Sequence, residues 1–268
     1  MSTRRRAVSA LVLCLSAACG LLAAEAPAPT RLVLVGGGAK PAEALARFVQ
    51  WAGGPKARLL VIPWASAEAQ ASYDALRADF AAYGPAAIEP SPFAPLTEAS
   101  RTELLEKLAR ATGVFFGGGD QGRIMDVLKD EALLQAMRAR HRAGVVFGGT
   151  SAGTAVMSAR MITGEGNFTV LDGDRVEVRP GLALLPAAVI VDQHFIKRQR
   201  ENRLFGLVLK HRERGVGIDE GAALLVEGDQ AEVVGGSVML VDARPEPGTL
   251  LVTLVPPGRR IDLLPHGP

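Results

Sequence analysis

The chain has 268 residues, of which 48% are hydrophobic and 22% are charged, enough to bury the core of one large domain. Three arginines and no acidic residue lie in the first 24 residues, so without that segment the formal charge falls from +2 to −1. The basic balance therefore gives no support for nucleic-acid binding. Both cysteines, Cys14 and Cys19, also lie in this segment, which excludes a disulfide framework and thiol chemistry from the rest of the chain.

The amino-terminal segment has the three parts of a secretory signal: a basic start, an apolar run to Ala24, and a small-residue end. The apolar run is short for a membrane span. We expect a signal peptide over 1–24, cleaved after Ala24 or Ala26, and export to the periplasm or secretion. Lipidation of Cys19 is the less favoured alternative, because Ser16 stands three residues before it, where a large aliphatic residue is typical.

Short apolar runs alternate with helical patterns through the first half of the chain. We expect strands at 31–35, 58–63, 86–90, 112–119 and 144–147. Helical spacing predicts helices at 41–51, 66–83, 100–110 and from about 121 to 142. Pro41 stands at a favoured helix start, and Ser100 with Glu103 predicts a capping box for the third helix.

Strands that are apolar throughout and separated by helices are typical of a parallel sheet covered on both faces. From Gly215 onward, the segments GVGIDE, AALLVE, AEVVGG and SVMLVDA predict short antiparallel strands that complete the same domain. We therefore expect an α/β fold over 25–268. It is a three-layer α/β/α sandwich with a mostly parallel sheet and antiparallel strands added near the carboxyl terminus.

The segment from Gly149 to Gly153 matches G-x-S-x-G between an apolar strand and a predicted helix. In a nucleophile elbow the serine sits at a sharp, strained turn, and only small residues fit two positions before and after it. Ser151 would then be a nucleophile, and the amide of Ala152 could hold an oxyanion at the helix start. The alternative is that Thr150 or Ser151 caps a helix over 152–160.

A serine nucleophile needs a base, and the chain has four histidines. His194 follows the apolar strand AAVIVDQ and is the one histidine at a strand end, whereas His141 and His211 lie in charged helix ends. We therefore expect His194 to be the base. Spacing alone leaves the acid open among Glu165, Asp172, Asp174, Glu177 and Asp192.

Two glycine-rich segments also follow strands. Gly117–Gly119 precedes Asp120, a predicted helix cap, and the amide of Gly119 could supply a second oxyanion donor while Gln121 reaches substrate. Gly36–Gly38 lacks the third glycine of a dinucleotide fingerprint, because Pro41 stands at that position. We interpret Gly36–Gly38 as a tight turn.

Three arginines follow His194: Arg198, Arg200 and Arg203. In a helix from Ile196, Arg200 shares an apolar stripe with residues such as Leu204. A buried arginine needs a carboxylate partner, either internal or from a ligand, so the stripe favours an acidic group on the substrate.

The chain resembles cyanophycinase and the wider dipeptidase E-like serine peptidases. The segments that carry the likeness are FFGGGDQGR, GGTSAGTAVMSARMITG, GLALLPAAVIVDQHFIKRQRENRLF and GVGIDEGAALLVEG. DQHF followed by spaced arginines resembles the cyanophycinase branch in particular. The likeness implies a fold similar to class I glutamine amidotransferases, with serine in place of their cysteine.

By position, the resemblance implies Ser151 as nucleophile, His194 as base and Glu165 as the third member, with Glu177 behind it. It also implies a substrate pocket, and the residues that would line it are Gln121, Asp192, Gln193, Arg198, Arg200 and Arg203. The export signal is similar to that of exported cyanophycinases.

The resulting hypothesis is a serine exopeptidase that cleaves cyanophycin, a poly-aspartate with arginine on each side-chain carboxyl, to β-Asp-Arg dipeptides. The amides of Ala152 and Gly119 would bind the oxyanion. No cofactor or metal is expected, since the sequence offers no ligand cluster for a metal. Whether the chain forms a homodimer is left open. The alternatives are a related exported peptidase acting on other aspartyl or isoaspartyl peptides, and a non-catalytic binding protein.

Overall fold

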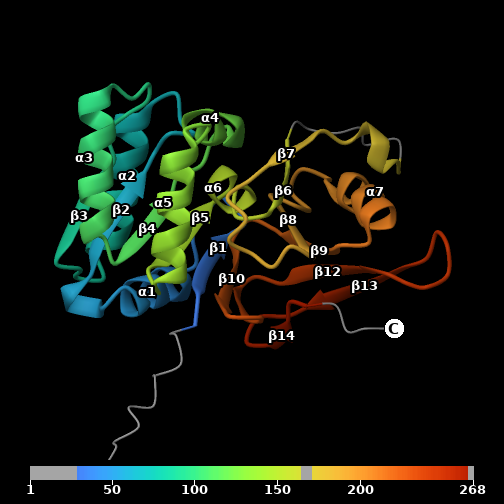
Figure 1. Cartoon of the computed structure of the whole chain (residues 1–268). Coiled ribbons are helices and arrows are strands. Elements are labelled where there is room, and N and C mark those ends of the chain that lie inside the picture. Colours follow the sequence, from blue (N-terminus) through green and yellow to red (C-terminus); the bar gives the residue numbers. More distant parts are fainter. Residues whose placement is uncertain (1–28, 164–170, 265–268) are drawn as a thin grey trace, which may run out of the picture.

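The computed structural model describes residues 29–163 and 171–264 (Figure 1). The expected signal peptide, both cysteines and Glu165 lie outside the described residues. No helix in the described part of the chain combines the length and the apolar character that crossing a membrane requires.

An eight-stranded sheet forms the centre of the molecule, in the order β14-β11-β10-β1-β5-β4-β2-β3. Its members β1, β5, β4, β2 and β3 are parallel, whereas β10, β11 and β14 are added antiparallel beyond β1. In chain order their bounds are β1 (Arg31–Val35), β2 (Arg58–Ile62), β3 (Ala87–Pro90), β4 (Gly113–Phe116), β5 (Val146–Thr150), β10 (Ala222–Glu227), β11 (Gln230–Gly235) and β14 (Arg260–Asp262). The predicted mixed fold is confirmed, including the short third strand.

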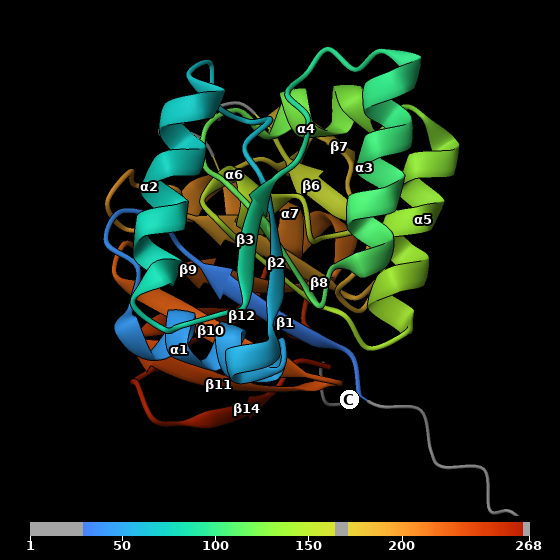
Figure 2. The same ribbon diagram turned by 90° about the vertical axis from the view of Figure 1, so that its left-hand side faces the viewer.

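Helices cover both faces of this sheet because its central strands are apolar on both sides. In β1, Leu32 and Leu34 join one buried cluster while Val33 and Val35 join the other. Helices α1 (Ala42–Trp51) and α2 (Ala69–Ala81) cover the valine side. The leucine side packs against α3 (Glu98–Arg110), α4 (Gln121–Val127), α5 (Glu131–Arg142) and α6 (Ala152–Ala155) (Figure 2).

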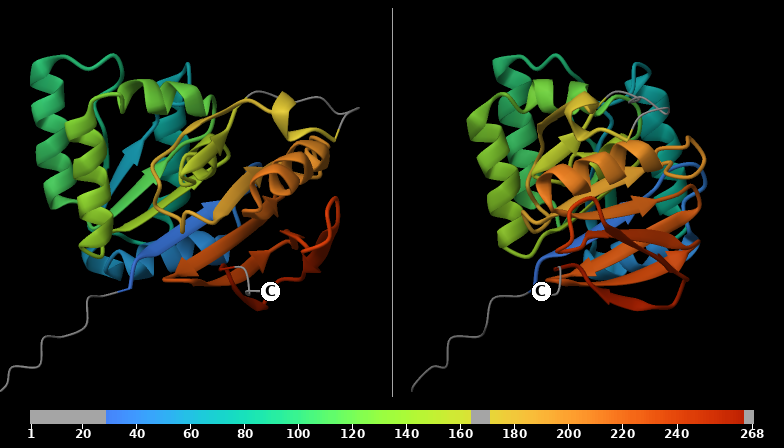
Figure 3. Two further views of the ribbon diagram at one scale, coloured as in Figure 1. Left: turned by 45° about the vertical axis from the view of Figure 1, so that its right-hand side comes forward. Right: turned by 90° about the vertical axis from the view of Figure 1, so that its right-hand side faces the viewer.

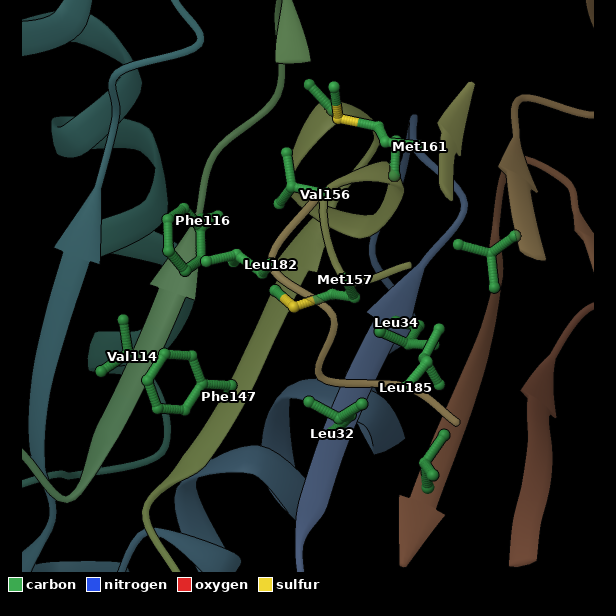
Figure 4. Close-up of a cluster of buried hydrophobic side chains, with 14 of the residues drawn as sticks. Leu32, Leu34, Val114, Phe116, Phe147, Val156, Met157, Met161, Leu182 and Leu185 are labelled. Atoms are coloured by element: carbon green, nitrogen blue, oxygen red, sulfur yellow. The ribbon is translucent and has the colours of Figure 1, made fainter. Parts of the chain in front are cut away.

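Aromatic rings fill the cluster on the valine side. The ring centroids of Phe48, Phe80 and Phe115 are 5.0 to 5.3 Å apart, a spacing at which aromatic pairs attract one another beyond their apolar burial. The leucine side contains Phe116 and Phe147 with methionine and aliphatic side chains around them (Figure 4). The two clusters fix the sheet between its helical layers.

A second sheet of four strands lies beside the first, in the order β13-β12-β9-β8 (Figure 3). Its strands are β8 (Val189–Gln193), β9 (Arg214–Ile218), β12 (Val238–Ala243) and β13 (Leu250–Val255). Helix α7 (Glu201–His211) packs on it through Leu204 and Val208. The antiparallel strands expected near the carboxyl terminus are confirmed, and β9, which pairs antiparallel with β12, also has a parallel neighbour in β8.

Three short elements complete the described chain. A hairpin is formed by β6 (Arg160–Ile162) and β7 (Val178–Pro180), and single turns of 3₁₀ helix are formed by η1 (Gly54–Lys56) and η2 (Gly173–Arg175). Strand β6 lies beside β8, and η2 packs against α7 (Figure 1).

Several helix bounds differ from the sequence prediction: α2 is shorter at both ends, and the helix expected from about 121 to 142 is divided into α4 and α5. Helix α3 begins at Glu98, because Thr97 and Ser100 form the capping box in place of Ser100 and Glu103. Helix α6 ends at Ala155 and not at residue 160. Helix α7 begins at Glu201, and the preceding residues form turns that leave Ile196 46% exposed. The apolar stripe expected from Ile196 therefore does not exist, although Arg200 is buried as predicted.

Candidate active site

Ser151 stands at a sharp turn between β5 and α6, with φ 54° and ψ −115°. A Cβ on Gly149 would lie 2.3 Å from the carbonyl of Gly153, so the two glycines that flank the serine must lack side chains. Backbone of this kind costs about 1–3 kcal/mol and persists only where the surrounding structure holds it in place. The amide of Ser151 donates to the carbonyl of Val35 at 3.1 Å, which ties the turn to β1. The predicted elbow geometry is confirmed.

The Ser151 hydroxyl makes no cap hydrogen bond with α6. Its oxygen lies 2.8 Å from His194 Nε2, and His194 Nδ1 lies 2.7 Å from Glu220 Oε1. When Nδ1–H donates to the Glu220 carboxylate, Nε2 is left to accept the serine proton. The Gln193 side-chain oxygen, at 3.3 Å, is a second acceptor for the same hydroxyl. Ser151, His194 and Glu220 thus form a hydrogen-bonded chain in the order of a catalytic triad.

Glu220 is the functional candidate that sequence reasoning missed. It follows β9, and because β8 and β9 are parallel neighbours, His194 and Glu220 leave the second sheet at the same edge. Of the two predicted glutamates, Glu177 does not occupy this position, because it is exposed just before β7, whereas Glu165 lies outside the described residues. The carboxylate of Asp192 is bound by Arg203, and that of Asp172 accepts the amide of Asp174.

The available signal was the acidic pair in GVGIDEG at the end of an apolar strand. Glu220 lies beyond His194 in the chain, whereas all the acids predicted from spacing lie between Ser151 and His194.

The turn Gly36–Gly38 makes room for the histidine and glutamate. A Cβ on Gly37 would lie 2.3 Å from His194 Cε1, and one on Gly38 would lie 2.9 Å from Glu220 Oε2. The same turn binds the pair through its backbone, since the Gly36 carbonyl accepts the His194 amide at 2.8 Å. The interpretation as a tight turn is correct, and the absence of side chains in that turn also shapes the site.

The surroundings keep His194 neutral. The side chain is 9% exposed, and burial is the main cause that lowers its pKa below the ordinary value. The hydrogen bond to Glu220 raises the pKa, whereas the charges of Arg198 and Arg200 lower it. A neutral imidazole at physiological pH is the form that can accept a proton from serine.

Two backbone amides beside the serine are free to bind an anion. Within the described residues, the amides of Ala152 and Gly119 donate to no acceptor. Gly119 has φ 136°, and a Cβ at the neighbouring Gly118 would lie 3.4 Å from Ser151 Cβ, so the Gly117–Gly119 loop runs past the nucleophile. Donors of this kind can stabilise a developing oxyanion.

The predicted pocket residues fall into two groups. Asp192 and Arg203 are 1% and 2% exposed, and Arg203 Nε donates to the Asp192 carboxylate at 2.6 Å. Arg200 donates to the backbone carbonyl of Gln193 at 2.9 Å, and Gln121 donates to the carbonyl of Ile162 at 2.8 Å. The carboxylate partner expected for the buried Arg200 has an internal candidate in Asp192, 3.9 Å from Arg200 Nη1, and Asp192 also pairs with Arg203.

Arg198, in contrast, is exposed, and its charge lowers the pKa of His194. It is the cation of this group that a substrate can reach without displacing buried side chains. That the six pocket residues contact the substrate stays a prediction.

The sequence is similar to those of several known proteins. Residues 32–234 match peptidase family S51. A cyanophycinase of Geminocystis herdmanii is 36% identical over 220 residues, covering 79% of this chain and 80% of that protein. A cyanophycinase of Trichormus variabilis is 38% identical over 218 residues, covering 78% and 73%. A Peptidase E of Streptomyces coelicolor is 30% identical over 141 residues, covering 49% and 55%.

Solved structures with the same fold include a peptidase from an acI-B1 Actinobacterium. It matches with a TM-score of 0.67 at 23% identity, over 88% of this chain and 98% of that one. A putative Peptidase E of Listeria monocytogenes matches with a TM-score of 0.56 at 15% identity, over 78% and 99%. At these identities the likeness supports the fold alone, which agrees with the α/β architecture expected from the sequence.

Proposed function

The chain belongs to peptidase family S51 and is a serine-type peptidase, and from this premise we propose that it hydrolyses cyanophycin to β-Asp-Arg dipeptides from a chain end. The observation that carries the chemical part is the hydrogen-bonded chain from Ser151 through His194 to Glu220. The likeness to proteins named cyanophycinase, at 36–38% identity, supports the choice of substrate.

In this mechanism Ser151 Oγ attacks the carbonyl carbon of an aspartyl backbone peptide bond while His194 Nε2 takes the hydroxyl proton. Glu220 holds the imidazole in the required tautomer and stabilises its charged form. The amides of Ala152 and Gly119 receive the oxyanion. The carbon–nitrogen bond then breaks, and the proton on His194 passes to the leaving amine.

The resulting acyl-enzyme is hydrolysed by the same groups. Water gives a proton to His194 and its oxygen attacks the ester, and the proton then returns to Ser151 Oγ as the product acid leaves. Each group used in acylation is used again in reverse. In this proposal Glu220 replaces Glu165 as the acid, because Glu220 lies 2.7 Å from His194 Nδ1.

The exposed Arg198 supports an acidic substrate group next to the scissile bond. In cyanophycin, carboxylates of the arginyl side chains and of the polymer end are available to it. Gln121, Gln193, Arg200, Asp192 and Arg203 would shape the wall behind that contact. Export of the protein, by the segment 1–24, would place the activity where external polymer is the substrate.

The test is incubation of the purified protein with cyanophycin, with mass spectrometry to detect β-Asp-Arg. We expect dipeptide release by the wild-type protein and none by Ser151→Ala. We also expect a fluorophosphonate probe to label Ser151. Absence of dipeptide release by the folded wild-type protein would overturn the substrate assignment.

The alternative substrate class is aspartyl or isoaspartyl peptides other than cyanophycin. The observation in its favour is the 30% identity to a Peptidase E over 141 residues. A protein that cleaves short Asp-containing peptides but leaves cyanophycin intact would support this alternative. A protein that leaves both intact and is not labelled at Ser151 would support a binding role instead.

A further inference from the structure

A cavity of about 620 Å³ opens at the carboxyl edge of the parallel strands, on the side of β2 and β4. Its walls come from the segment after β2, the segment between β3 and α3, and the helices α3, α4 and α5 (Figure 2). The volume lies within the range of sites that bind small molecules. None of its lining residues belongs to the triad.

The cavity adjoins the catalytic residues through a single loop. Ser66 lines the cavity, and its neighbour Ala65 accepts the Asp120 amide at 2.9 Å. A Cβ on Gly119 would lie 2.2 Å from the Ala65 carbonyl, while Gly118 lies against Ser151. The Gly117–Gly119 loop therefore has the nucleophile on one side and the wall of the cavity on the other. A long substrate that occupies the catalytic residues passes within reach of this cavity.

The lining combines an apolar floor with a charged rim. Trp64, Leu96 and Val127 contribute apolar surface, and five charged side chains surround it: Glu98, Arg101, Arg123, Asp126 and Asp130. A side chain with an apolar stem and a polar end fits such a lining, because the stem covers apolar surface while the end stays at the rim.

Two of the rim charges have no ion-pair partner among the described residues. Arg101 pairs with Asp130 at 2.6 Å, and Asp126 pairs with Arg179 at 2.8 Å. Glu98 and Arg123, both exposed, form no ion pair in residues 29–163 and 171–264. The cavity thus offers one anion and one cation to a ligand.

We propose that this cavity binds the arginyl side chain of a repeat unit of the polymer distant from the scissile bond. The proposal rests on the proposed function. Each such side chain carries three methylenes, a guanidinium and a carboxylate. The methylenes cover the apolar floor, Glu98 binds the guanidinium and Arg123 binds the carboxylate. The cavity contributes to the binding of long chains and takes no part in the chemical step.

The test compares a long polymer with the shortest cleavable substrate, two linked β-Asp-Arg units. Charge reversals Glu98→Lys and Arg123→Glu, and the neutral Glu98→Gln and Arg123→Gln, are measured on both substrates. We expect each neutral variant to raise KM for the polymer about two- to fivefold, the range for one exposed ion pair, and each reversal to raise it further. The kcat for polymer and both constants for the short substrate should stay unchanged.

Matched controls are Glu106→Lys and Arg110→Glu, which reverse exposed charges on α3 outside the cavity. They should leave KM for the polymer unchanged. An equal rise of KM for both substrates, or no rise for the polymer with any cavity variant, would overturn the cavity assignment while leaving the proposed function intact. If the wild-type protein releases no dipeptide from the polymer, both the proposed function and this inference fall.

Discussion

At the scale of single residues, the position of Glu220 decides which carboxylate serves His194. Its side chain is 34% exposed, so water can take over part of its role when the charge is removed. We expect Glu220→Gln to lower kcat by about 10²- to 10⁴-fold, because the amide can hold the imidazole in the wrong tautomer. The measurement is steady-state dipeptide release by the folded variant.

Two controls accompany the Glu220 variant. Glu177→Gln changes an exposed carboxylate before β7 and should leave kcat unchanged. Glu165→Gln tests the residue that the family resemblance implied, and it too should leave kcat near the wild-type value. A large loss with Glu165→Gln and a small one with Glu220→Gln would contradict the geometry around His194 Nδ1.

The charges around His194 also set the pH dependence. Activity requires the neutral imidazole, so kcat/KM rises with pH through the pKa of His194 in the free enzyme. Because burial, Arg198 and Arg200 lower this pKa, we expect the acid limb to have its midpoint below about 6.5. Removing a nearby positive charge makes protonation easier, so Arg198→Ala should shift the midpoint upward.

Arg198→Lys keeps the charge and is the matched control, with an expected midpoint close to that of the wild type. Loss of a substrate contact alone would raise KM at every pH and leave the midpoint unchanged. A midpoint that is unmoved, or lower, in Arg198→Ala would show that the charge of Arg198 does not act on His194.

At the scale of elements, the loop Gly36–Gly38 after β1 connects the two sheets at the active site. Gly37 has φ 122° and faces the His194 ring, whereas Gly84 has φ 63° and open space around it. Alanine at either position strains the backbone and should destabilise the fold by about 1 kcal/mol or more. Gly37→Ala should in addition displace the imidazole and lower kcat on the order of 10²-fold.

Gly84→Ala controls for backbone strain, and its kcat should match that of the wild type. The measurements are kcat and the free energy of unfolding for both variants. If Gly37→Ala kept full kcat at any loss of stability, the loop would not be needed for the position of His194.

The elements also show what sequence patterns can predict. The apolar runs predicted the parallel strands, because strands buried on both faces leave a continuous local signal. The elbow at Ser151 and the strand-end position of His194 were predictable because their signals are also local: the G-x-S-x-G spacing and the apolar strand before the histidine. The start of α3 was not, since Thr97 and Ser100 compete with Ser100 and Glu103 for the same capping pattern.

Glu220 was missed for a different physical reason. Its place beside His194 depends on the pairing of β8 with β9, which are separated in the chain by all of α7. A sequence indicates where a strand ends but not which strand lies next to it. The same limit hid Asp192 as an internal partner of Arg200 and Arg203, since the local sequence predicted that Arg200 is buried but not which charge it meets.

At the scale of the whole molecule, the site lies where the two sheets meet. Ser151 follows a strand of the eight-stranded sheet, whereas His194 and Glu220 follow strands of the four-stranded sheet. The backbone bond from the His194 amide to the Gly36 carbonyl links the sheets at that point. The triad therefore exists only when both sheets are folded and packed together, and stability of the second sheet limits activity.

The buried pair of Asp192 and Arg203 tests this dependence, because it joins β8 to α7 directly behind His194. Asp192→Asn keeps the shape but removes the buried negative charge that accepts two Arg203 hydrogen bonds, which should destabilise the fold by about 3–5 kcal/mol. A typical domain is stable by only about 5–15 kcal/mol, so activity should also be lost at a lower urea concentration.

Asp126→Asn makes the same change in a pair whose acid is 52% exposed, and should cost at most about 1 kcal/mol. Urea denaturation followed by circular dichroism and by dipeptide release measures both losses, and equal losses in the two variants would show that the Asp192 pair does not hold the second sheet.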